Sequence, residues 1–83
     1  MATQATVIAF HRTTGLLGME LGNGSCVLAE HLHGAAPQRG QTLSGEMATF
    51  GEATWVDTRS GEEIAVFVQA YDIARDAVEL AMR

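Results

Sequence analysis

The sequence is short of cysteine, of lysine and of long apolar runs, and each shortage excludes a class of structure or function. Cys26 is the one cysteine among 83 residues, so neither an intrachain disulfide nor a thiolate metal cage can form. No run of about 18 apolar residues could span a membrane, and no basic, apolar leader opens the chain. We therefore expect a soluble, cytoplasmic protein without membrane contact, in which Cys26 is a small buried hydrophobic residue.

Positive charge is equally scarce. The five basic residues are all arginines and face ten carboxylates, which gives a formal net charge of −5. The arginines are scattered along the chain, at positions 12, 39, 59, 75 and 83. Because proteins bind nucleic-acid backbones by neutralising phosphates with cations, this balance argues against tight nonspecific binding of nucleic acid. An acidic surface favours instead a basic protein partner, attracted by electrostatic steering.

What the sequence does have is a series of short β-forming runs separated by glycines. Residues 6–12, 16–21 and 25–32 are predicted strands, and Gly-Asn-Gly at 22–24 predicts a hairpin between the second and the third. Residues 41–56 are a predicted strand with interruptions at Gly45 and Gly51, and residues 64–68 form the most hydrophobic run. Five short strands around one small core predict a closed or nearly closed barrel of the OB or SH3-like kind.

Two consequences follow from the alternation of side chains in the third strand. Val27, Ala29, His31 and His33 are predicted on one face, and Cys26, Leu28, Glu30 and Leu32 on the other. The pair His31-x-His33 is thus a low-probability metal site, because no third ligand is evident. Cys26 and His31 are predicted on opposite faces, which makes them a poorer candidate for a nucleophile pair, because activation needs hydrogen-bond contact.

The last residues, 72–83, are predicted as a helix. Ile73, Ala77, Leu80 and Ala81 have the i, i+4, i+7, i+8 spacing of one helical face, and Asp72 can cap its first turn. A final strand, with apolar residues alternating at 78, 80 and 82, is the competing interpretation. The helix either plugs the open mouth of the barrel or leaves Ile73, Ala77 and Leu80 exposed as a surface for a partner.

Several motifs resemble those of the cold-shock family. Residues 6–10 (Thr-Val-Ile-Ala-Phe) match its opening Gly-Thr-Val-Lys-Trp-Phe strand, and residues 14–19 match its Lys-Gly-Phe-Gly-Phe-Ile motif with one residue more. Residues 26–31 stand at its Val-Phe-Val-His-Phe motif, and Gly40, Thr42 and Leu43 are similar to its fourth-strand start. The resemblance implies a mainly β, five-stranded OB-like barrel at about residues 5–71, followed by the helix, as one domain over residues 1–83.

The resemblance also implies binding of single-stranded nucleic acid, but this sequence lacks the aromatic residues on which that family stacks bases. Ala9 stands in place of the family's tryptophan, and leucine and methionine in place of two phenylalanines. Each missing stacking platform removes about 1–3 kcal/mol of binding free energy. Phe10, His11, Arg12 and His31 remain as candidates for a weak nucleic-acid surface, although Phe10 is more readily a barrel core residue.

No catalytic constellation emerges. The glycines at 15, 18, 22 and 24 do not form a phosphate loop, because no helix follows them and the chain has no lysine. Phe50, Trp55 and Phe67 either form a ligand-stacking patch or fill one end of the barrel. We therefore expect a non-enzymatic module without a cofactor that recognises a protein partner or self-associates, with weak binding of single-stranded nucleic acid as the alternative.

Overall fold

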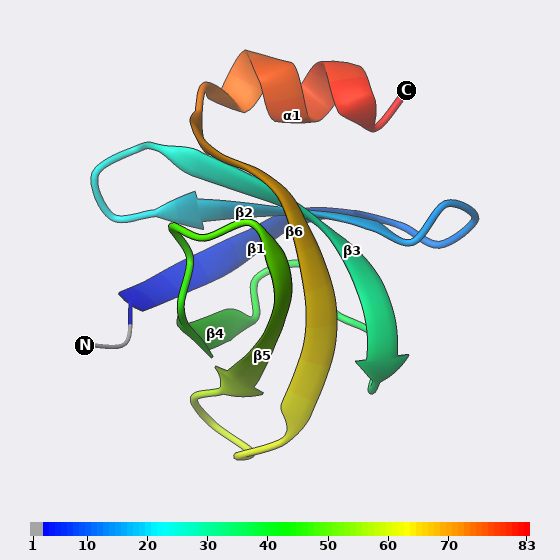
Figure 1. Ribbon diagram of the computed structural model, residues 1–83, viewed down its shortest axis with the longest axis vertical. Coiled ribbons are helices and arrows are strands. Elements are labelled where there is room, and N and C mark those ends of the chain that lie inside the picture. Colours follow the sequence, from blue (N-terminus) through cyan, green and yellow to red (C-terminus); the bar gives the residue numbers. More distant parts are fainter. Residues whose placement is uncertain (1–2) are drawn as a thin grey trace.

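The computed structural model describes residues 3–83 and shows a closed barrel with a short helix outside it (Figure 1). Its elements are β1 (Thr3–His11), β2 (Leu16–Leu21), β3 (Cys26–Gly34), β4 (Thr42–Gly45), β5 (Gly51–Asp57), β6 (Glu63–Ile73) and α1 (Arg75–Ala81). The strands follow the order β1-β2-β3-β6-β5-β4, and β4 pairs back with β1. Each of the six pairings is antiparallel. The predicted mainly β barrel with a C-terminal helix is confirmed, with six strands rather than five.

The additional strand comes from residues 41–56, which the sequence predicts as one interrupted strand. The chain leaves β4 after Gly45 and enters β5 at Gly51, whose φ is +93°. This left-handed conformation is open to glycine and strained for most other residues. The two glycines predicted as bends are therefore the ends of two separate strands.

Inward-pointing residues of all six strands form the core of the barrel, together with Met47 between β4 and β5. The Gly-Asn-Gly hairpin places β2 and β3 side by side as predicted, and Gly24 donates its amide to the carbonyl of Leu21. The largest core side chain is Trp55, which is fully buried and donates its indole N–H to the carbonyl of Glu46 at 2.9 Å. The buried cluster consists of Ala5, Val7, Leu17, Met19, Val27, Ala29, Leu43, Met47, Trp55, Ile64, Val66 and Val68.

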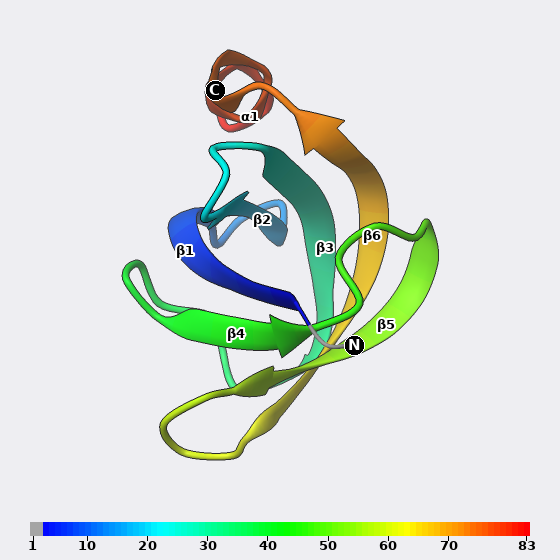
Figure 2. The ribbon, with the colours of Figure 1, turned by 90° about the vertical axis from the view of Figure 1, so that its left-hand side faces the viewer.

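Helix α1 covers the outer surface of the barrel over β2 and β3 (Figure 2). Its one fully buried residue is Val78, which lies over Gly18 on the outer face of β2. The side chains of Met82 and Ile8 also reach within 4 Å of the position that a Cβ of Gly18 would occupy. The interpretation of the helix as a plug for the barrel mouth is therefore wrong, because its buried side chain packs on the outside of a strand.

The boundaries of the helix also differ from those predicted. Strand β6 continues to Ile73, and Asp72 within it has a φ of +56°. Ala74 is the N-cap residue and makes no side-chain capping hydrogen bond, so Asp72 is not the cap. The competing interpretation of residues 77–82 as a final strand is wrong, since α1 includes all of them but Met82, its C-cap. The strand continues past the predicted end because Ile73 still pairs with Cys26 of β3.

Candidate functional site

The residues predicted for nucleic-acid binding lie near one end of the barrel. Phe10 and His31 contact each other edge to face, with ring centroids 5.9 Å apart and an interplanar angle of 88°. Phe10 also packs against the barrel core. His11 accepts a hydrogen bond from the amide of Thr14 at 3.4 Å, and Arg12 is exposed. The structure thus brings Phe10 and His31 together, but it uses the Phe10 ring for packing.

The two histidines of the His31-x-His33 pair do not share a face. The register pairs His31 with Val66 and His33 with Ala65, so Leu32 is an additional residue in β3. Neighbouring residues of β6 point to opposite faces, and residues directly opposite across a pair share a face. The bulge at Leu32 therefore separates side chains that simple alternation predicts together. Residues 3–83 contain no group of three or more His, Cys, Asp or Glu side chains that could hold a metal ion.

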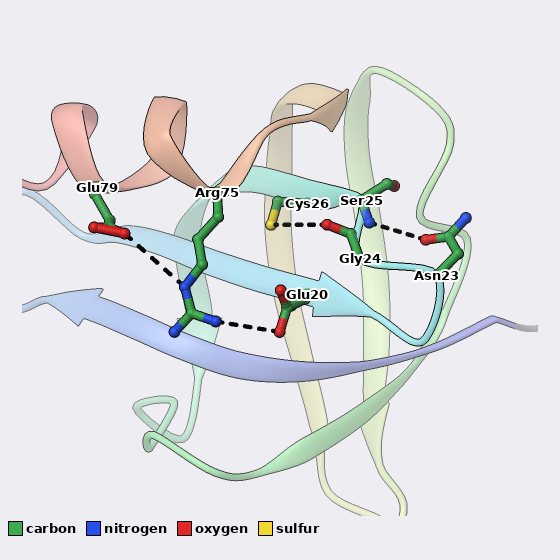
Figure 3. A network of polar contacts seen from close by, with 7 residues as sticks. All are labelled: Glu20, Asn23, Gly24, Ser25, Cys26, Arg75 and Glu79. Atoms are coloured by element: carbon green, nitrogen blue, oxygen red, sulfur yellow. Dashed lines mark hydrogen bonds and ion pairs between the residues drawn. The ribbon is translucent and has the colours of Figure 1, made fainter.

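The predicted partner-binding stripe on α1 is only partly exposed. Leu80 is 65% exposed and Ala77 is also exposed, whereas Ile73 is half-buried within β6. At the first turn of the helix, the guanidinium of Arg75 lies 3.5 Å from a carboxylate oxygen of Glu20 in β2 and 4.0 Å from one of Glu79 (Figure 3). Ala77 and Leu80 are one turn apart and together form a small apolar surface.

Cys26 is buried, as the sequence predicts, at the outer side of β3 next to the segment that leads into α1 (Figure 3). Its Sγ lies 3.8 Å from the carbonyl oxygen of Gly24. Burial, together with the charge of Glu20, raises the pKa of the thiol above its ordinary value, and Arg75 opposes this rise. A thiol kept protonated and covered is unreactive, so Cys26 is a packing residue.

The three aromatic residues considered as one patch lie in three different environments. Trp55 is inside the barrel, and Phe50, 67% exposed, lies in the β4–β5 loop with its ring centroid 4.8 Å from that of Tyr71. Phe67 is on the outer face of β6 and is 43% exposed. Neither a shared stacking patch nor a common filling of one barrel end is formed.

Phe67 nevertheless lies at the centre of a surface that the sequence did not indicate. It is directly opposite Glu30 of β3 on one side and Glu52 of β5 on the other. Side chains in such positions have Cβ atoms about 4.5–5.5 Å apart. Next to this row, a shallow hollow of about 390 Å³ is lined by residues that include Leu32, Glu52 and Ala65. We call the outer surface formed by Glu30, Leu32, Glu52, Thr54, Ala65 and Phe67 the Phe67 face.

The Phe67 face is uncovered in the described part of the molecule, since α1 lies over β2 and β3 and leaves the outer side of β5 and β6 open (Figure 2). The two ion pairs within residues 3–83 both involve Arg75, so neither Glu30 nor Glu52 is paired there. No sequence pattern indicates this arrangement, because residues 30, 52 and 67 belong to different strands. Only the register of β3, β6 and β5 brings them into one row.

Comparison of the chain with protein-family models, curated proteins and solved structures finds no match. The resemblance to cold-shock domains therefore rests on the motifs described above, and the structure adds a small barrel that is compatible with it. Within residues 3–83 no helix is both long and apolar enough to cross a bilayer.

Proposed function

We propose that this barrel is a non-catalytic interaction module that binds a basic segment of another protein on the Phe67 face. The observation that carries the proposal is the row Glu30–Phe67–Glu52, in which strand register places an exposed phenylalanine between two acidic residues that form no ion pair in the described chain. Phe67 is 43% exposed on the outer face of its strand, and its ring surface is open to a ligand. Its position between two acidic residues favours a ligand that is both apolar and cationic.

Arginine is the side chain that fits this row best. Its planar guanidinium can stack on an aromatic ring and donate paired hydrogen bonds to carboxylates. Stacking at an exposed ring is worth about 0.5–1 kcal/mol, and each exposed ion pair about 0–1 kcal/mol. With contributions of this size from a single arginine, we expect millimolar or weaker affinity for each such contact, which suits a transient interaction.

The test is an NMR titration of the ¹⁵N-labelled protein with an extended peptide of alternating arginine and leucine. We expect shift changes in residues of β3, β5 and β6, weakening as salt is added because the ion pairs are exposed. Phe67→Ser should abolish the changes, and Glu30→Gln with Glu52→Gln should reduce both affinity and salt dependence. Phe50→Ser is the matched control, since it removes another exposed phenylalanine away from this face.

Two results would contradict the proposal. The first is an equal loss of binding in Phe50→Ser and Phe67→Ser, which would show that binding of the peptide is not specific to the Phe67 ring. The second is the same response to a peptide with glutamate in place of arginine. Either result would remove the specific role of the Phe67 face.

Self-association through α1 is a second form of the same interaction function, favoured by the exposed pair Ala77 and Leu80. Sedimentation velocity over a range of concentrations tests it. We expect any dimer to dissociate in Leu80→Glu, while circular dichroism shows an unchanged fold. A monomer at all concentrations would leave the Phe67 face as the interaction surface.

The alternative function, weak binding of single-stranded nucleic acid, is supported by the cold-shock motifs and by the exposed guanidinium of Arg12. Fluorescence anisotropy with a labelled single-stranded oligonucleotide, at low and then moderate salt, tests it. Micromolar affinity that falls with salt and is lost in Arg12→Ala would favour this function and an OB-like relationship. No binding at low salt would count against both.

A further inference from the structure

Three of the five arginines, far apart in the sequence, are brought to the same end of the barrel. Because all strand pairs are antiparallel, the connections β1–β2, β3–β4 and β5–β6 emerge at one end, and β2–β3 and β4–β5 at the other. Arg12 lies in the β1–β2 connection, Arg39 in the β3–β4 connection and Arg59 in the β5–β6 connection. We call this the arginine end; Arg75 begins α1, which follows the end of β6 remote from the β5–β6 turn (Figure 1).

The arginine end is hollowed in two adjoining places. A hollow of about 520 Å³ is lined by residues that include Arg39 and Arg59, and a second of about 410 Å³ by residues that include Arg12 and Arg39. Gln38 and Arg39 line both. Among all lining residues the one carboxylate is that of Asp57, so the hollows are cationic on an acidic protein. Glu62 and Glu63 follow Arg59 but line neither hollow.

The three guanidinium groups form no ion pair in the described chain. The ion pairs within residues 3–83 are those of Arg75 with Glu20 and with Glu79. Arg12, Arg39 and Arg59 are all exposed and make no such pair there. The charges of Arg12 and Arg39 are thus available to a ligand, whereas that of Arg59 also contributes to lowering the pKa of Asp57.

The two turns that carry Arg39 and Arg59 are fixed to each other by Gln41. The backbone N–H of Gln41 donates to the carbonyl of Gln38 at 3.1 Å, and the side-chain Oε1 of Gln41 accepts from the backbone N–H of Gln38 at 2.9 Å. These two hydrogen bonds close the first turn. The Nε2 of Gln41 donates to Asp57 Oδ2, at the start of the second turn. Asp57 Oδ1 in turn accepts from the amides of Arg59 and Ser60 at 2.6 and 2.9 Å. The carboxylate of Asp57 therefore links the two turns through its hydrogen bonds.

We propose that the arginine end binds a small ligand that carries two or more phosphate groups. Three guanidinium groups around two adjoining hollows suit several negative charges on one molecule, and the planar fork of arginine matches the oxygens of a phosphate. The hollows fall in the size range of small-molecule sites, about 300–1,000 Å³. Arg39, which lines both hollows, is the central residue. This inference is independent of the Phe67 face.

Isothermal titration with inorganic pyrophosphate and tripolyphosphate at low salt tests the proposal. We expect Arg39→Gln to weaken binding about tenfold or more, since a hydrogen bond to a charged group is worth about 1.5–3 kcal/mol. Arg12→Gln and Arg59→Gln should each weaken it less than Arg39→Gln. Arg75→Gln is the matched control, because it makes the same change in net charge on the other side of the molecule. All four positions are exposed, and thermal unfolding checks that each variant folds.

The same titration can overturn the proposal in three ways. Equal weakening by Arg75→Gln and Arg39→Gln would show a general charge effect in place of a site. Equal affinity for citrate would show that phosphate is not the recognised group. Binding of a single-stranded oligonucleotide through these arginines, with none of pyrophosphate or tripolyphosphate, would assign the arginine end to nucleic acid.

Discussion

Gly18 lies directly beneath Val78, and the absence of a side chain at Gly18 is what allows α1 to approach the barrel. A Cβ built at position 18 collides with Cγ1 of Val78. Gly18 is therefore required here for close packing, and its φ is not in the left-handed region. The contact joins the C-terminal helix to the outer face of β2.

From this contact we predict that Gly18→Ala destabilises the fold. The added methyl group overpacks the interface, which typically costs about 1–3 kcal/mol. Urea unfolding measures the change, with Gly22→Ala as a control because a Cβ there meets no atom within 4 Å. In the double variant Gly18→Ala, Val78→Ala the loss should be smaller than the sum of the single losses. Strict additivity would show that the two residues do not meet.

The rate of labelling of Cys26 should report the docking of α1. A buried thiol reacts only when the structure opens locally. Val78→Ala removes two buried methyl-sized groups, at about 0.8 kcal/mol each, so the helix should open about tenfold more often. Reaction with a thiol reagent under native conditions measures this, and Val7→Ala in the barrel core is the control. Equal acceleration in both variants would mean that Cys26 is exposed only by global unfolding.

The stability of the fold should fall at acidic pH through Asp57. The hydrogen bond from Gln41, followed by those from the amides of Ser60 and Arg59, lowers the pKa of Asp57 below its ordinary value. A carboxyl group with a lowered folded pKa stabilises the native state above its unfolded pKa of about 3.9, and this contribution is lost as pH falls through the folded value.

Asp57→Asn isolates this contribution. We expect a lower melting temperature than that of the wild type at pH 7, and a difference that shrinks below pH 4. Glu62→Gln, which removes a neighbouring exposed carboxylate, serves as the control. A difference between wild type and Asp57→Asn that stays constant at every pH would show that the charge of Asp57 is not involved.

The single tryptophan gives a direct probe of the core. Trp55 is fully buried and hydrogen-bonded to Glu46, so its fluorescence should be blue-shifted and resist quenching by acrylamide. Trp55→Phe should cost about 1–3 kcal/mol of unfolding free energy, from lost volume and the lost hydrogen bond. Phe67→Leu, at an exposed position, should change stability by less than about 0.5 kcal/mol. Ready quenching of the native protein would contradict the position of Trp55.

Local sequence determined much of the fold. Alternation over residues 26–29 placed Val27 and Ala29 in the core and Cys26 on the outer side, and Gly-Asn-Gly fixed the β2–β3 hairpin. The breaks at Gly45 and Gly51 were also visible, because glycine marks positions where a strand ends or bends. These features depend on neighbours in the chain, which the sequence displays directly.

The tertiary structure alone decided which distant residues meet. The bulge at Leu32 and the row Glu30–Phe67–Glu52 follow from strand register, and Val78 became the buried residue of α1 because Gly18 leaves room for it. Arg12, Arg39 and Arg59 looked scattered, yet closure of an antiparallel barrel sends alternate connections to the same end. Such contacts depend on the pairing of strands. The sequence does not display them directly, because register is set by the packing of the whole core.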